Sequence, residues 1–170
     1  DTMHHAAQKY ESYGMKIIWR SMKGFAVEEQ CRIIDELRSE VNALIINPVN
    51  HPLIIEKINQ CVKAGIFVVT LNNDIEASLR HCYVGSDYLQ GGRTAGALLR
   101  MIGADSIRTG VLLGSRNMLG HQQRLTGFLE TMGQHNDFAC LSVQETNDDD
   151  MIAYEETRQL LAEHPETSSL

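Results

Sequence analysis

The hydrophobic positions along the chain follow two alternating spacings, one typical of helices and one of buried strands. In residues 26–41 apolar side chains recur every three or four positions, which predicts an amphipathic helix. The run that follows at 43–48, ALIINP, is short, apolar and ended by proline, and it predicts a strand. The same pair returns as a predicted helix at 51–64 and a predicted strand at 66–71. The pattern therefore indicates alternating helices and strands.

Further expected elements extend this alternation along the chain. They are a helix at 1–13 ended by Gly14, strands at 15–20, 81–85, 109–114 and 138–143, and helices at 86–103, 118–133 and 150–163. Wholly apolar strands of about five residues are typical of parallel sheets covered by helices, because half-buried antiparallel strands alternate apolar and polar side chains. We predict an α/β fold in which each sheet is parallel and carries helices on both faces.

A polar stretch divides the predicted elements into two groups. We expect residues 1–103 to form an N-terminal lobe, 104–108 to cross between lobes, and 109–170 to begin a C-terminal lobe. The second group offers only two strands and two helices, which bury too little apolar surface for a doubly wound core. The first group opens inside a helix, although such lobes normally open on a strand. We therefore expect the first strand and the later part of the second lobe to lie outside these residues.

Composition and charge exclude some classes of partner. The chain has 170 residues and a net charge of −7, which argues against nucleic-acid binding by these residues, since phosphate binding needs a surplus of lysine and arginine. No apolar run approaches the ~20 residues of a membrane helix, and the first residues lack the pattern of a signal peptide. The cysteines are widely spaced and are interpreted as reduced core thiols, which favours the cytoplasm. They are Cys31, Cys61, Cys82 and Cys140.

Polar side chains follow two successive predicted strands. Asn72, Asn73 and Asp74 come directly after the strand at 66–71, and Asn47 ends the strand before it. Ligands of open parallel sheets bind beyond the carboxyl ends of the strands, where loops and helix N-termini converge. Asn-Asn-Asp is also a common turn sequence, because these residues accept turn dihedrals. Amides at two strand ends favour a binding site over a turn.

The chemistry of these side chains suits an uncharged ligand. Amides and one carboxylate can donate to and accept from vicinal hydroxyls, as a sugar or polyol requires. Nucleotide, metalloprotease and hydrolase motifs are absent, so the sequence predicts neither catalysis nor a cofactor. The run Asp148, Asp149, Asp150 lacks the spacing of a calcium loop and is interpreted as a helix cap, and no histidine pair has metal-ligand spacing.

The second lobe supplies a complementary group. Arg124 lies near the first turns of the predicted helix 118–133 and just off its apolar stripe, so it can donate two hydrogen bonds to adjacent hydroxyls. The alternative for Arg124 is an ordinary surface salt bridge. Asn117 and His121 could reach the same cleft, or they could be ordinary loop residues.

In order, the segments ALIINP, AGIFVVTLNND, YVGSD followed by GG, GVLLGS and QQRLTGF closely resemble the effector-binding core of the lactose and galactose repressor family. That core is similar to periplasmic sugar-binding proteins of the ribose-binding type. The resemblance covers essentially the whole chain, and it implies two hinged lobes around a sugar or sugar phosphate. It implies ligand contacts at Asn47 and Arg124. It also implies them at Asn72 and Asn73, where the family often has an aspartate followed by an arginine.

Our leading hypothesis is the effector-binding part of a cytoplasmic transcription regulator. A sugar-like ligand would shift the lobe arrangement of a homodimer, and DNA would be read by a helix-turn-helix outside these residues. The wide apolar face of the predicted helix 51–64 fits either core packing or the dimer contact. A second hypothesis is the secreted solute-binding component of a sugar transporter. A third, an α/β enzyme, would need a nucleophile and a base, which the sequence does not offer.

Overall fold

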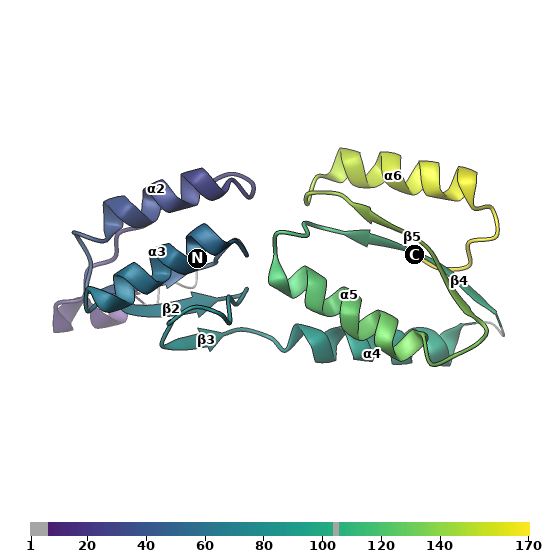
Figure 1. Cartoon of the computed structure of the whole chain (residues 1–170), viewed down its shortest axis with the longest axis horizontal. Helices are drawn as coiled ribbons and strands as arrows, with labels where there is room; N and C mark the ends of the chain where they lie inside the picture. The colour runs from purple at the N-terminus through teal and green to yellow at the C-terminus, as the bar shows by residue number, and fades with distance from the viewer. Residues whose placement is uncertain (1–6, 104–105) are drawn as a thin grey trace.

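A computed structural model describes residues 7–103 and 106–170 and has two groups of elements along its long axis (Figure 1). The first group comprises η1 (Glu11–Tyr13), α2 (Val27–Leu37), β1 (Ala43–Ile46), α3 (Pro52–Lys63), β2 (Phe67–Leu71) and β3 (Cys82–Val84). The second comprises α4 (Tyr88–Ile102), β4 (Ile107–Leu113), α5 (Leu119–Met132), β5 (Phe138–Glu145) and α6 (Asp150–Glu163). Residues 1–6 of the predicted first helix and 104–105 of the predicted crossover lie outside the described residues.

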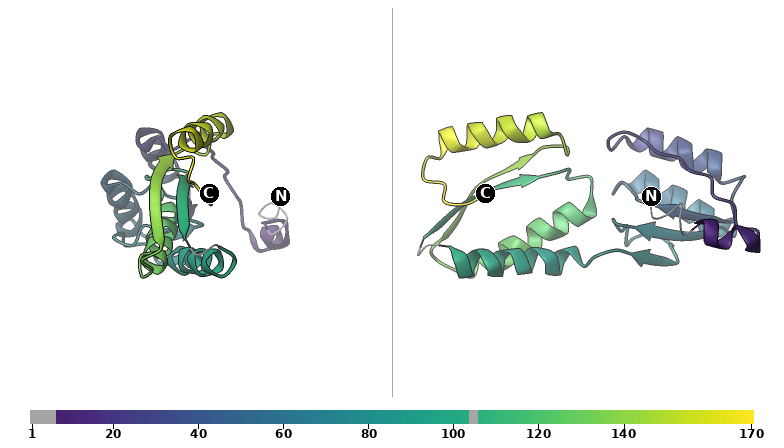
Figure 2. Two further views of the ribbon diagram at one scale, coloured as in Figure 1. Left: turned by 90° about the vertical axis from the view of Figure 1, so that its right-hand side faces the viewer. Right: turned by 180° about the vertical axis from the view of Figure 1, so that it is seen from behind.

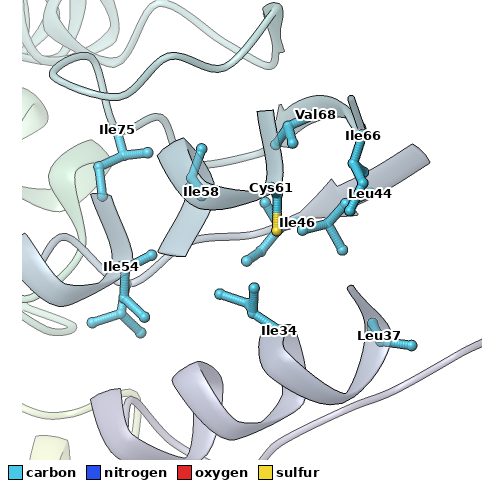
Figure 3. Packing of buried hydrophobic residues seen from close by; sticks show 11 residues of the cluster. Ile34, Leu37, Leu44, Ile46, Ile54, Ile58, Cys61, Ile66, Val68 and Ile75 are labelled. Atoms are coloured by element: carbon cyan, nitrogen blue, oxygen red, sulfur yellow. The ribbon is translucent and has the colours of Figure 1, made fainter. Parts of the chain in front are cut away.

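The first lobe is a parallel sheet of order β1-β2-β3, packed against α2 and α3. Leu44 of β1 lies beside Val68 of β2, which fixes which side chains face the helices. Figure 3 shows Ile34 of α2 and Ile54 of α3 pointing into this core, and both are at most 1% exposed. The alternation of buried and exposed residues in β1 and β2 places one face of the sheet in the core.

The two faces of this sheet differ in how the described helices cover them. Both α2 and α3 contribute to the same core, whereas Ile45 and Phe67 on the other face are 56% and 49% exposed. The chain crosses the sheet in a single direction from β1 to β3. Because crossovers between parallel strands are right-handed, a chain that moves in one direction places its helices on one face.

The second lobe has helices on both sides of its two-stranded parallel sheet, as predicted. Helices α4 and α5 lie together on one side of β4 and β5, and α6 lies on the other (Figures 1 and 2). The N-terminus of α6 is capped by Asp149, whose side chain accepts hydrogen bonds from the backbone N–H groups of Met151 and Ile152. The predicted capping role is confirmed for Asp149.

Helix α4 packs with the second lobe, although the prediction assigned it to the first. A Cβ atom added at Gly92 would overlap the backbone carbonyl of Arg124 in α5, and one added at Gly127 would overlap the carbonyl of Leu89 in α4. Gly92 of α4 and Gly127 of α5 thus allow the two helices to approach closely. On this packing the lobes are joined after β3, at residues 85–87, and not at 104–108.

Residues 15–20 have the composition of a strand but belong to no strand in the structure. The segment stands apart from the sheet (Figure 2), and a cavity of about 940 Å³ is lined by residues 14–22 on one side and by β1 on the other. Ile17 remains 44% exposed. A strand gains its hydrogen bonds from a neighbour, so an apolar run with no strand beside it does not form one.

The four cysteines are free thiols, as predicted, but they are not all core residues. Cys61 is buried, whereas Cys82 in β3 is exposed. Burial raises the pKa of the thiols of Cys31, Cys61 and Cys140, which keeps them protonated and unreactive.

Candidate functional site

The strands of both lobes end at the junction between the lobes. In Figure 1 the carboxyl ends of β2 and β3 point toward the second lobe, and those of β4 and β5 point toward the first. The N-termini of α4 and α5 lie at the same junction. The residues that follow each strand are therefore brought together here, as the pattern of strand ends predicts.

Asn72 and Arg124 both contact the side chain of Tyr88. The hydroxyl of Tyr88, the first residue of α4, donates a hydrogen bond to Oδ1 of Asn72 at 2.6 Å. The guanidinium carbon of Arg124 lies 4.6 Å from the centre of the same ring. Asn72 has a φ of 66°, a left-handed conformation that asparagine tolerates better than most residues. The two predicted site residues thus lie close together, with Tyr88 between them.

The guanidinium of Arg124 forms no hydrogen bond or ion pair with any other described residue, and the side chain is exposed. Other arginines of the chain do pair with carboxylates, for example Arg93 with Glu130 at 2.9 Å. The surface salt bridge that the sequence left open for Arg124 is therefore not formed. The guanidinium instead lies over the ring of Tyr88.

Asn73, which follows β2, contacts both the end of β1 and the second lobe. Its Nδ2 donates to Oδ1 of Asn47 at 3.0 Å, and its Oδ1 accepts from the backbone N–H of Gly120 at 3.2 Å. Asn73 is only 4% exposed, whereas Asn47 is exposed and its own Nδ2 donates to no described residue. Of this pair, Asn47 is the residue that presents a free donor.

Asp74 is tied into the first lobe and not into the junction. Its carboxylate forms an ion pair with Arg80 and accepts hydrogen bonds from the Thr70 hydroxyl and the Ile75 N–H, both at 2.8 Å. Burial alone would raise the pKa of Asp74, but these hydrogen bonds, led by Arg80, outweigh it and lower the pKa below its usual range. With its oxygens used in this way, Asp74 holds the loop between β2 and β3.

Asn117 and His121 both shape the loop between β4 and α5. The carbonyl oxygen of Asn117 accepts a hydrogen bond from the backbone N–H of Asn50 across the junction, at 2.7 Å, while its side chain is exposed. The ring Nδ1 of His121 accepts a hydrogen bond from the backbone N–H of Ser115 at 2.8 Å. Each residue thus has a structural task in addition to its place near the junction.

Two cavities adjoin these residues, and each is lined by different members of the predicted site. Asn47 lines the cavity of about 940 Å³, together with Leu71 and Met118. Arg124 and His121 line a second cavity of about 490 Å³ beside α4 and β4. Asn47 and Arg124 therefore line different cavities.

Sequence reasoning missed two residues of the junction, Tyr88 and Gly120. Tyr88 follows the helix-capping Asp87, whose side chain accepts from the N–H of Gln90 at 2.9 Å, so the start of α4 was a recognisable signal. Gly120 lies in the first turn of α5 without a positive φ, and a Cβ there would lie 2.7 Å from Oδ1 of Asn73. A glycine inside a predicted helix can indicate a close contact with another element, and this was the signal that the sequence offered for Gly120.

Residues 7–103 and 106–170 contain neither a cluster of metal ligands nor a membrane-spanning helix. No group of three or more potential metal-ligating side chains gathers within these ranges. None of the helices in the same ranges has the length and apolar character needed to cross a membrane.

The family comparison matches almost the whole chain. The family model described as "Periplasmic binding protein domain" matches residues 2–169. A D-ribose/D-allose-binding protein of Pseudomonas aeruginosa is 27% identical over 150 residues, which are 83% of this chain and 46% of that protein. The chain therefore spans about half the length of this relative.

Solved structures share the fold. A glucose-galactose binding protein of Geobacillus stearothermophilus, GanP, has a TM-score of 0.85 and 23% identity, over 96% of this chain and 59% of that one. A transporter solute-binding protein of Burkholderia graminis in complex with D-arabinose has a TM-score of 0.88 and 20% identity, over 95% of this chain and 57% of that one. The predicted fold class is confirmed, and the narrower assignment to repressors stays a prediction.

Proposed function

Since the chain belongs to the periplasmic binding protein domain family, we propose that it is the sugar-binding part of a solute-binding protein that supplies a membrane transporter. The named relatives are sugar-binding proteins, and the one from Burkholderia graminis is a transporter solute-binding protein in complex with D-arabinose. The observation that carries the proposal is the pair formed by Asn47, which follows β1, and Arg124, which lies on α5, because both have free donors at the junction between the lobes.

The chemistry of these two residues favours a neutral polyhydroxylated ligand. Asn47 offers an amide N–H₂ from the first lobe, and Arg124 offers a planar fork of donors from the second. Asp74, the carboxylate predicted for the site, is already neutralised by Arg80, so it leaves no negative charge for a cationic ligand. Asn72, Asn117 and His121 lie around the same junction and complete the proposed surroundings of the ligand.

Arg124→Ala is expected to weaken sugar binding by roughly tenfold to a hundredfold, about 1–3 kcal/mol, because charge-assisted hydrogen bonds to hydroxyls are lost. A thermal-shift screen of the intact protein with D-ribose, D-allose, D-galactose and D-arabinose identifies the ligand, and calorimetry then measures the affinity of the variant. Arg93→Ala is the matched control, because Arg93 is an exposed arginine on the neighbouring helix. Equal affinity in the Arg124 and Arg93 variants would remove Arg124 from the site.

A regulator is the second candidate, supported by the free thiols of all four cysteines, which suit a reducing cytoplasm. The predicted DNA contact and homodimer belong to this candidate and stay predictions. The two candidates share lobes and site but differ in location, since a transporter component works outside the cytoplasmic membrane. A signal peptide upstream of these residues in the gene would support the transporter component, and a helix-turn-helix there would support the regulator.

A further inference from the structure

Two adjacent asparagines of the first lobe each hold the start of a helix in the second lobe. Asn72 accepts a hydrogen bond from the hydroxyl of Tyr88, the first residue of α4. Asn73 accepts one from the backbone N–H of Gly120, in the first turn of α5. We name Asn72, Asn73, Tyr88 and Gly120 the interlobe clasp.

Asn73 acts as the N-cap of α5 from the opposite lobe. The first backbone N–H groups of a helix have no partner within the helix and need an outside acceptor. Met118, the residue at the cap position of α5, supplies no side-chain hydrogen bond. The amide oxygen of Asn73 takes that place, at 3.2 Å from the N–H of Gly120. Separating the lobes therefore removes the cap of α5.

The same contact leaves Asn73 little capacity for a ligand. The side chain is 4% exposed, its oxygen accepts from Gly120, and its nitrogen donates to Asn47. A ligand could reach this amide only by displacing Gly120 or Asn47. Asn73 is thus a contact between lobes, although its position in the sequence suggested a contact with the ligand.

Gly120 makes the close approach possible. A Cβ at this position would lie 2.7 Å from Oδ1 of Asn73 and 2.6 Å from Cδ2 of Tyr88, closer than carbon atoms pack. The backbone does not itself require glycine, because Gly120 has no positive φ. The contact between the lobes therefore explains why residue 120 is a glycine. The helix does not explain it, because glycine weakens a helix.

We infer that the interlobe clasp sets the balance between joined and separated lobes, and that its contact between Asn73 and Gly120 controls ligand affinity without touching the ligand. This inference rests on the proposed function, because it assumes a ligand that binds between the lobes. The affinity for such a ligand falls with the fraction of protein in the joined arrangement. Loss of one helix cap changes that equilibrium by about fivefold.

The first experiment compares Gly120→Ala with Gly91→Ala in the intact protein. A Cβ at Gly91, in the first turn of α4, meets nothing within 4 Å, so this control adds the same methyl group without a clash. We expect Gly120→Ala alone to increase the radius of gyration in small-angle X-ray scattering. We also expect it to weaken binding of D-ribose or D-allose by about fivefold or more. Scattering and binding equal to those of the Gly91 control would overturn the inference.

A second experiment separates the clasp from a direct ligand contact. With no sugar present, Asn73→Ala should increase the radius of gyration, whereas a residue that only contacts ligand would leave it unchanged. The double variant with Gly120→Ala should show little further increase, because both changes break one contact. Tyr88→Phe removes only the hydroxyl bonded to Asn72 and should give a smaller increase. Additive increases from Asn73→Ala and Gly120→Ala would refute a shared contact.

The scattering results stand independently of sugar binding. If no tested sugar binds the unmodified protein, the proposed function fails for those sugars, while the scattering of the variants still reports on the clasp. If sugars bind and Asn73→Ala leaves the scattering unchanged, the clasp is refuted and the proposed function is retained.

Discussion

Gly92→Ala is expected to destabilise the second lobe by about 3 kcal/mol, because the added methyl group cannot fit between α4 and α5. It would overlap the backbone carbonyl of Arg124, and backbone cannot move aside as a flexible side chain can. Gly127→Ala should act similarly from the opposite helix, against the carbonyl of Leu89. Urea unfolding followed by circular dichroism measures the loss.

The neighbouring glycine provides the control for this prediction. Gly91 lies in the same helix, and a Cβ there meets no atom within 4 Å. Gly91→Ala is therefore expected to stabilise α4 by about 0.5–1 kcal/mol, since alanine restricts the unfolded chain more than glycine does. Opposite signs for adjacent glycines would show that contact between helices sets the cost. A loss of the same size at both positions would contradict this packing.

Arg80→Ala is expected to cost about 3 kcal/mol of stability, because it leaves the carboxylate of Asp74 unpaired in a nearly buried position. The side chains of Asp74 and Arg80 are 10% and 20% exposed, so water replaces the lost partner poorly. Arg93→Ala breaks the exposed pair with Glu130 and should cost less than about 1 kcal/mol. Urea midpoints of the two variants at neutral pH give the comparison.

The stabilisation by Arg80 should disappear in acid. The pKa of Asp74 is lowered in the folded protein, so the pair contributes fully above the pKa of about 3.9 of an unfolded aspartate. That contribution is lost as the pH falls through the lower folded pKa. We expect the difference between unmodified protein and Arg80→Ala to be constant down to about pH 5 and to shrink below about pH 4. A difference independent of pH in this range would mean that the carboxylate of Asp74 is not its source.

The predicted site residues contact different partners in the folded protein, and their sequence does not indicate which. Asn72, Asn73 and Asp74 are consecutive, yet one meets Tyr88, one caps α5 and one pairs with Arg80. Local sequence predicted that all three follow a strand, because an apolar run ends there. Which partner each side chain meets depends on the left-handed turn at Asn72 and on elements distant in the chain.

The sequence by itself determined the order and kind of most elements and the capping of α6 by an aspartate, because apolar spacing and cap residues act within a few positions. Only the tertiary structure decided that α4 belongs to the second lobe, since its glycines could have faced a sheet or a helix. It also decided that residues 15–20 form no strand and that Asn73 joins the lobes. Each of these outcomes depends on which distant surface is available as a partner, and local spacing carries no information about that.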